Sequence, residues 1–186
     1  MRIQYNSPVI LTYTLLCAGI LFAAGFIPSL MRLFTVVPHA WGWTDPLAYF
    51  RLFSHALGHG NLGHLVGNFT LILLIGPILE EKYGSSDILT MMVFTAGVTG
   101  ILQTIFFSEG LLGASGIAFM LIVLSSVTNF QKGRIPLTFI LVMLLFVGQE
   151  VYQSVAVSDQ VSQFAHIIGG LCGGLFGFML QGGKVK

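Results

Sequence analysis

Long blocks of apolar residues alternate with short polar and charged stretches along this chain of 186 residues. Charged residues are almost absent inside the blocks, and each block approaches the ~20 residues that a helix needs to cross a bilayer. The pattern predicts an all-α membrane protein with six transmembrane helices in a single domain, residues 1–186. The helices are expected at about 8–30, 61–79, 88–107, 114–130, 136–152 and 162–181.

The connection between the first two predicted helices, about residues 31–60, is longer than the others and rich in aromatic residues. It contains Trp41, Trp43, Tyr49 and Phe50 between a few charges. Aromatic side chains of this kind are enriched where a membrane meets water. We therefore expect an interfacial loop that packs on the bilayer surface and not a seventh span.

Composition narrows the class of protein further. The chain is 55% hydrophobic and 8% charged, with a mean hydropathy of +0.88, whereas soluble domains carry about 25% charged residues. A lipid bilayer is therefore the expected surrounding. With a net charge of +1 and no long basic patch, no nucleic-acid partner is expected. Cys17 and Cys172 lie in apolar runs and are expected to be packing residues.

Lysine and arginine residues predict the orientation in the membrane. No small-residue cleavage site follows the first apolar block, so it is expected to be a retained helix. With the N-terminus inside, six basic residues lie on the cytoplasmic side and two, Arg32 and Arg51, lie outside. This bias predicts a multi-pass protein of the cell (inner or plasma) membrane with both termini in the cytoplasm.

Polar side chains gather at the start of the second predicted helix. His64 and Asn68 are four residues apart, so they lie within about 40° of each other on one helix face. Asn61 is a natural N-cap, which leaves His59 in the loop before the helix. One interpretation is that His64 and Asn68 only join helices by hydrogen bonds. The other is a functional role, which clustered polar groups inside a membrane favour.

Two further stretches carry candidate chemistry. Gly113-Ala-Ser115-Gly116 opens a helix directly after an outer loop, where backbone N–H groups lack helical partners. Such a serine suits a nucleophile whose oxyanion product needs donors. His166 precedes a strip of glycines that recurs every fourth residue, at Gly169, Gly173 and Gly177. Such a strip lets another helix approach closely, and the helix that begins near Ser115 is the expected neighbour.

Taken in order, these stretches resemble the bacterial rhomboid family of intramembrane serine proteases. The family pattern His-x4-His-x3-Asn is matched by His59, His64 and Asn68, and its Gly-x-Ser-Gly by the stretch around Ser115. Four residues of the last helix and two further pairs complete the resemblance: Ala165, His166, Gly169 and Gly173, then Glu80 with Gly84, and Phe50 with Arg51. The resemblance implies the six-helix rhomboid fold with its interfacial loop.

The resemblance also implies a role for each matched residue. Ser115 is implied as the nucleophile and His166 as the general base of a catalytic dyad. The oxyanion hole is implied to consist of His64, Asn68 and the backbone N–H of Ser115. Three further residues are implied to shape the site: Gly113 would form part of the oxyanion hole, Phe119 would stack on the ring of His166, and His59 would hold the loop. His55 is implied to lie at the entrance of the site.

The resemblance therefore predicts a hydrolase, an intramembrane serine endopeptidase that cleaves transmembrane protein substrates near their outer ends. No cofactor and no metal are expected. The departures are Phe50 and Phe119, where tryptophan and tyrosine are usual, and Ser162, where glycine is frequent.

Three alternatives are weighed. A catalytically inactive rhomboid-like binding module for membrane proteins usually lacks the serine or the base, and both are present here. A metal site at His55, His59 and His64 lacks an acidic ligand and a His-Glu-x-x-His motif. A transporter is disfavoured because neither paired intramembrane charges nor an inverted repeat occur.

Overall fold

The computed structural model describes residues 3–38, 44–127, 137, 140–141, 144–145 and 160–181. Its main elements are helices: α1 (Pro8–Phe26), α3 (Leu62–Tyr83), α4 (Ser85–Phe106), α5 (Ser115–Val127) and α7 (Gln160–Gln181). Between α1 and α3 lie three short helices: η1 (Pro28–Phe34), α2 (Pro46–Ser54) and η2 (His55–Leu57). Within this part of the chain, extended pairing is limited to one bridge between Val36 and Leu111. The helix predicted at 136–152 falls largely outside the described residues.

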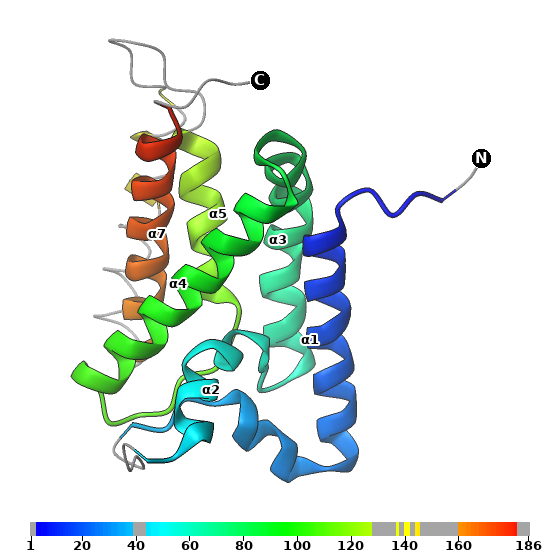
Figure 1. The fold of residues 1–186 in the computed structure, drawn as a ribbon, viewed down its shortest axis with the longest axis vertical. Coiled ribbons are helices and arrows are strands. Elements are labelled where there is room, and N and C mark those ends of the chain that lie inside the picture. Colours follow the sequence, from blue (N-terminus) through cyan, green and yellow to red (C-terminus); the bar gives the residue numbers. More distant parts are fainter. Residues whose placement is uncertain are drawn as a thin grey trace.

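The long helices form a bundle in which α4 is the inclined member. In Figure 1, α7, α5, α3 and α1 run side by side, and α4 crosses α7 and α5 diagonally. The short helix α2 lies near the end of the bundle where α3 and α5 begin. Helix α5 packs against α7 and α3, and α3 also packs against α1. The start of α5 is therefore enclosed by elements that are distant in sequence.

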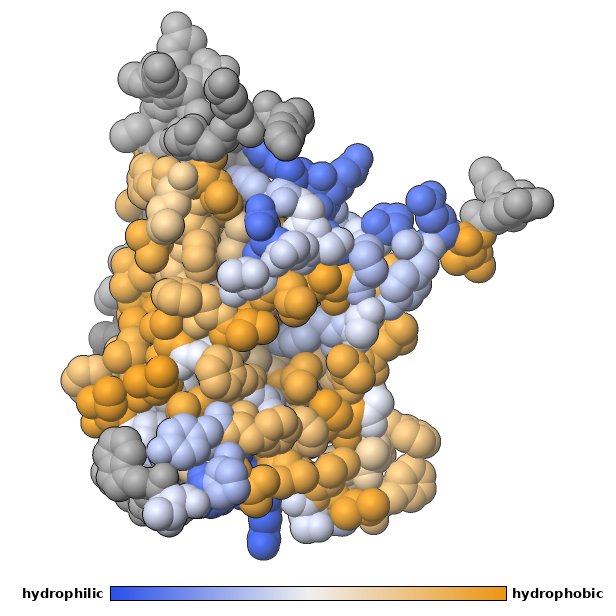
Figure 2. Space-filling model, viewed as in Figure 1, coloured by the Kyte–Doolittle hydropathy of each residue, from blue (hydrophilic) through white to orange (hydrophobic). Residues whose placement is uncertain are grey.

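Four of the described helices, α1, α3, α4 and α7, are long and apolar enough to cross a membrane. Helix α5 is apolar but shorter over its described length of 13 residues. Figure 2 shows apolar side chains over most of one face, with the most hydrophilic residues near the two ends. Such an apolar exterior suits a protein whose solvent is lipid. The chain is a multi-pass membrane protein, and the count of six spans stays a prediction.

Several predicted helix ends are wrong by about one turn, for local reasons. Helix α1 ends at Phe26 and not near Leu30, because Pro28 follows and its predecessor Ile27 leaves the helical region at φ −128° and ψ 81°. Helix α3 runs past Leu79 to Tyr83 and ends at Gly84, which has φ +87°. That left-handed backbone is the conformation that glycine adopts at helix ends without steric cost.

A buried carboxylate joins α1 to α3 and α4. Glu80, near the end of α3, is only 4% exposed. Its two oxygens accept hydrogen bonds from the backbone N–H groups of Val9 and Ile10, each at 3.0 Å, and one also accepts from Ser85 Oγ at 2.7 Å. The first N–H groups of a helix have no partner within that helix. Glu80 satisfies two of them at the start of α1.

The glycine strip on α7 makes the contact with α5 that the sequence predicted. A methyl group added to Gly169 would overlap the backbone of Gly116, and one added to Gly173 would overlap the carbonyl oxygen of Met120. Neither neighbour is a flexible side chain that could turn away. Only glycine therefore permits this helix spacing, which brings the first turns of α5 and α7 together.

Candidate active site

Ser115 is the first residue of α5 and is half-buried. The preceding turn passes through Gly113, whose φ of +132° lies in the region that L side chains rarely adopt. The backbone N–H of Gly113 donates to the carbonyl oxygen of His55 at 2.9 Å. This hydrogen bond ties the turn before the serine to η2. Ser115 thus stands at a helix start whose entry is held in one conformation.

Two side chains of α3 lie against this turn. A methyl group added to Gly113 would be 2.7 Å from Cε1 and 2.8 Å from Nε2 of His64, and 3.9 Å from Nδ2 of Asn68. Asn68 is 8% exposed, and its Nδ2 has no hydrogen-bond partner among the described residues. A buried amide is costly unless water, a ligand or a transition state supplies an acceptor. The predicted oxyanion-hole residues therefore converge on one point beside Ser115.

The start of α3 confirms the predicted N-cap. The Oδ1 atom of Asn61 accepts a hydrogen bond from the backbone N–H of His64 at 2.8 Å. Helix α3 begins at Leu62, so His59 lies in the preceding loop, as expected. The cap fixes where α3 begins and so fixes the height of His64 and Asn68 relative to Gly113.

His166 approaches α5 from the opposite side. Its ring stacks on that of Phe119, with centroids 4.3 Å apart and an interplanar angle of 35°. Phe119 lies one turn after Ser115 on the same helix. The carbonyl oxygen of Ala165, the residue before His166, would be 3.3 Å from a methyl group added to Gly116. The residue before His166 therefore lies against the residue after Ser115, and the pairing of Ser115 with His166 stays a prediction.

His59 is a buried support of this arrangement. Its side chain is fully buried, and its ring lies 5.1 Å from the ring of His64 and 5.7 Å from that of Phe69. Burial lowers the pKa of His59 from 6.5 to about 4, and repulsion from His64 acts in the same direction. His59 is therefore neutral at physiological pH and acts by packing against the ring of His64.

His55 links three elements, and only its general role at the entrance was expected. Its Nε2 lies 3.1 Å from the carbonyl oxygen of Ala96 in α4, so this nitrogen carries the proton and donates it. Its own backbone carbonyl accepts from Gly113. Burial lowers the pKa of His55 from 6.5 to about 4, which keeps the ring neutral. The next residue, Ala56, accepts a hydrogen bond from Tyr13 Oη of α1.

Tyr13 was not singled out by sequence. A hydroxyl in an otherwise apolar spanning segment was the available signal, because such a group needs a partner.

The three-histidine metal site is not assembled: His55 turns toward α4, whereas His59 packs beside His64. No cluster of three metal-ligating side chains occurs in the part of the chain that the structure describes.

A serine at a helix start, a histidine on the facing helix and two polar side chains of a third helix thus gather at the start of α5. Residues 46–182 match the sequence pattern of the family described as the Rhomboid domain. The match spans well over half of the chain, and the chain therefore belongs to the rhomboid family, a family of intramembrane proteases. It is also similar to the "Rhomboid protease GlpG" of Haemophilus influenzae, with 23% identity over 133 residues that cover 70% of this chain and 69% of that protein.

Proposed function

We propose that the chain is an intramembrane serine endopeptidase in which Ser115 is the nucleophile and His166 is the general base. The observation that carries the proposal is the convergence of groups on the start of α5. Ser115 opens the helix, the ring of Phe119 holds that of His166 at 4.3 Å, and two polar side chains of α3 meet at Gly113. A nucleophile, a base and oxyanion donors are the groups that peptide hydrolysis requires.

The acylation step uses the dyad directly. Ser115 Oγ attacks the carbonyl carbon of the scissile peptide bond, and its proton passes to a ring nitrogen of His166. When the carbon–nitrogen bond breaks, His166 returns this proton to the leaving amine, and the acyl group remains on Ser115 as an ester. In the second step His166 takes a proton from the water molecule that attacks the ester carbonyl carbon. When the carbon–oxygen bond to the serine breaks, His166 returns this proton to Ser115 Oγ, which releases the carboxylic acid product and regenerates both residues.

The oxyanion hole acts on the charge that appears between these states. The substrate carbonyl oxygen becomes negative when Ser115 attacks it. The side chains of His64 and Asn68 and the N–H of Ser115 would donate to this oxygen. The unpartnered Nδ2 of Asn68 is such a donor, held in place before the substrate arrives. Preorganised donors stabilise the transition state because they need not reorient as the charge develops.

Substrates would be transmembrane segments of other proteins, cut near their outer ends. Ser115 begins its helix at the end of the bundle where α3 also begins, which supports a site near one membrane surface over one at mid-bilayer. A stable helix hides its carbonyls in the i→i−4 hydrogen-bond ladder. Substrates with helix-weakening glycine or proline just past the cut would therefore be favoured. The glycines around Ser115 leave little room, so a small residue before the cut would also be favoured.

Cleavage by the purified full chain in detergent, with a panel of transmembrane substrates, tests the proposal. Ser115→Ala and His166→Ala should each abolish cleavage, and the double variant should be no worse, because the two residues act as a unit. Ser125→Ala is the matched control, since Ser125 is a half-buried serine on the same helix that bonds to the carbonyl oxygen of Ile122. It should cleave normally.

A fluorophosphonate probe gives an independent readout, because it reacts only with an activated serine. The probe should label Ser115 in the wild type and lose this label in His166→Ala. Near-normal cleavage by Ser115→Ala would refute the assignment of Ser115 as the nucleophile. A folded wild type that neither cleaves nor takes the label would instead point to an inactive binding module.

A further inference from the structure

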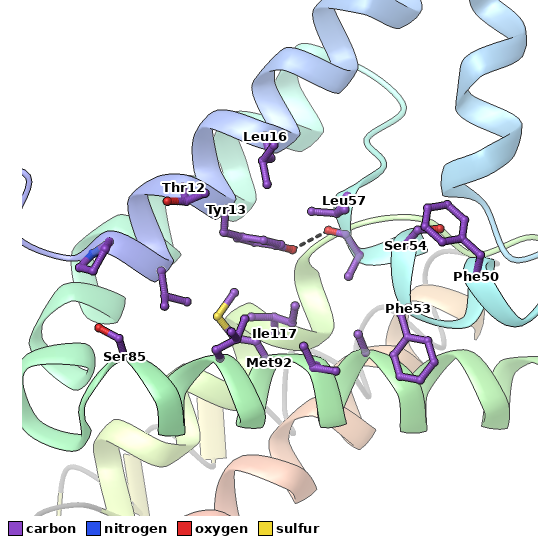
Figure 3. Close-up of a pocket in the computed structure, with 16 residues that line it drawn as sticks. Thr12, Tyr13, Leu16, Phe50, Phe53, Ser54, Leu57, Ser85, Met92 and Ile117 are labelled. Carbon is purple, nitrogen blue, oxygen red and sulfur yellow. Dashed lines mark hydrogen bonds between the residues drawn. The ribbon is translucent and has the colours of Figure 1, made fainter.

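An apolar cavity lies apart from the candidate site residues described above. It is a cavity of about 610 Å³ between α1, α2 and α4, and it reaches Ile117 of α5 (Figure 3). Its lining runs along α4 from Ser85 to Ala96, which is about 16 Å at the helical rise. Although α4 is inclined, this length is similar to the ~15 Å that the acyl chains of one leaflet span.

The lining is apolar, and its hydroxyl groups are already used. Thr12 pairs with Tyr5, and Tyr13 donates to the carbonyl oxygen of Ala56. Ser54 donates to the carbonyl oxygen of Leu33, and Ser85 donates to Glu80. A ligand in this cavity would therefore meet paired hydroxyls and hydrocarbon.

This chemistry excludes water and extended peptide as occupants. Buried water needs two to four polar partners, which the lining does not offer. An extended peptide would bring N–H and C=O groups that would remain unpaired in an apolar site. A purely hydrocarbon occupant has no polar group that would need a partner in the cavity.

The cavity is also continuous with the surface that faces lipid. Part of its wall consists of residues exposed on the outside of the bundle, among them Leu16, Leu89 and Val93, which are 51%, 50% and 47% exposed. Its floor is formed by Met92 and Ile117, each 3% exposed. Lipid chains that cover the exposed wall lie directly beside the floor, and an empty floor would lose the dispersion contacts that they can supply.

We propose that this cavity holds one acyl chain of a membrane phospholipid, with part of the chain against Met92 and Ile117. The inference requires only that the protein resides in a bilayer and does not depend on proteolysis. Ile117 lies two residues after Ser115, so the acyl chain would pack against the back of the helix that carries the candidate nucleophile.

Photolabelling of the full chain tests this assignment. The protein is reconstituted in vesicles of phosphatidylethanolamine and phosphatidylglycerol that contain a phosphatidylethanolamine with a diazirine on its acyl chain. After illumination, mass spectrometry of the digested protein locates the label. We expect label on Met92 or Ile117, which lipid outside the cavity does not reach, in addition to label on exposed residues.

Two variants of α4 make the test specific. Val93→Trp should fill part of the cavity and lower the label on Met92 and Ile117 by roughly tenfold, the factor expected when about two methylene groups lose their buried contacts. Ile101→Trp, at a residue of the same helix that is 45% exposed and does not line the cavity, should leave it unchanged. Leu89→Trp is a second filling variant should Val93→Trp fail to fold.

Three outcomes would overturn the proposal. Label confined to exposed residues would mean that the cavity takes up no acyl chain. An equal loss in the filling and control variants would mean that the label does not report on the cavity. Protein–protein crosslinks at Met92 or Ile117, in place of lipid label, would assign the space to another polypeptide.

Discussion

Replacing Gly169 by alanine should separate α5 from α7 and thereby disable the candidate site. A methyl group at this position would lie 2.7 Å from the carbonyl carbon of Gly116, whereas ordinary contact begins at 3.4 Å. The neighbour is backbone on a packed helix, and the carbonyl oxygen of Gly116 would be closer still, so relief requires the helices to move apart by at least ~0.7 Å. His166 lies one turn before Gly169 and would move with α7.

The effect on turnover follows from this displacement. A misplacement of about 1 Å between reacting groups costs on the order of 10²-fold in rate. We therefore expect Gly169→Ala to lower kcat by ~10- to 100-fold, with a smaller change in KM. The extra packing strain should also cost about 1–3 kcal/mol of stability, partly offset by the ~1 kcal/mol by which alanine favours a helix.

Gly174→Ala is the matched control on the same helix. A methyl group there would lie 3.9 Å from Val123 Cγ1, an ordinary contact. Steady-state cleavage of a transmembrane substrate and thermal unfolding in detergent should be measured for both variants. If Gly169→Ala cleaves as fast as Gly174→Ala, the close α5–α7 approach does not position the dyad, and the reasoning is refuted.

Three further predictions concern the supports of the site. Asn68→Ala should lower kcat by about 10²-fold with little change in KM, because its donor acts in the transition state; a pure KM effect in steady-state kinetics would contradict this. Stability should be greatest above pH 6.5 and fall as the pH drops from 6.5 to about 4, because His55 and His59 are neutral in the folded state while the unfolded state takes up protons. The loss of stability should reach roughly 3 kcal/mol per histidine. A thermal unfolding temperature that does not change over this pH range would contradict the prediction. Glu80→Ala should destabilise the protein by about 2–4 kcal/mol, because a buried and a part-buried N–H group of α1 lose their acceptor. The control Glu81→Ala, at an exposed residue, should unfold like the wild type.

Local pattern was sufficient for the features that depend on neighbours along the chain. The apolar blocks predicted the four long helices that suit a membrane, because a spanning helix must be apolar over its whole length. The cap at Asn61 and the glycine strip on α7 were also predicted, since each is a spacing rule within one helix. The rhomboid resemblance was confirmed for the same reason: its motifs are short and local. The helix at 136–152 and the count of six spans stay predictions.

Other features depend on where distant segments meet. The ends near Leu30 and Leu79 were misplaced for opposite reasons. Apolar character continues past Pro28, which stops α1, whereas it ends at Leu79 although α3 continues through three charged residues to Tyr83. Glu80 caps a helix that begins about 70 residues earlier in the chain, a contact that no local spacing encodes.

Some features of the candidate site follow from the sequence, and others depend on the tertiary structure. Its residue types and their order along the chain are determined by the sequence, whereas their distances are not. The stacking of Phe119 on His166, the approach of Asn68 to Gly113 and the hydrogen bond from Gly113 to His55 each join different elements. Such contacts are set by how closely the helices pack, and that closeness is decided only when glycine backbones, buried caps and side-chain volumes are satisfied together in the folded bundle.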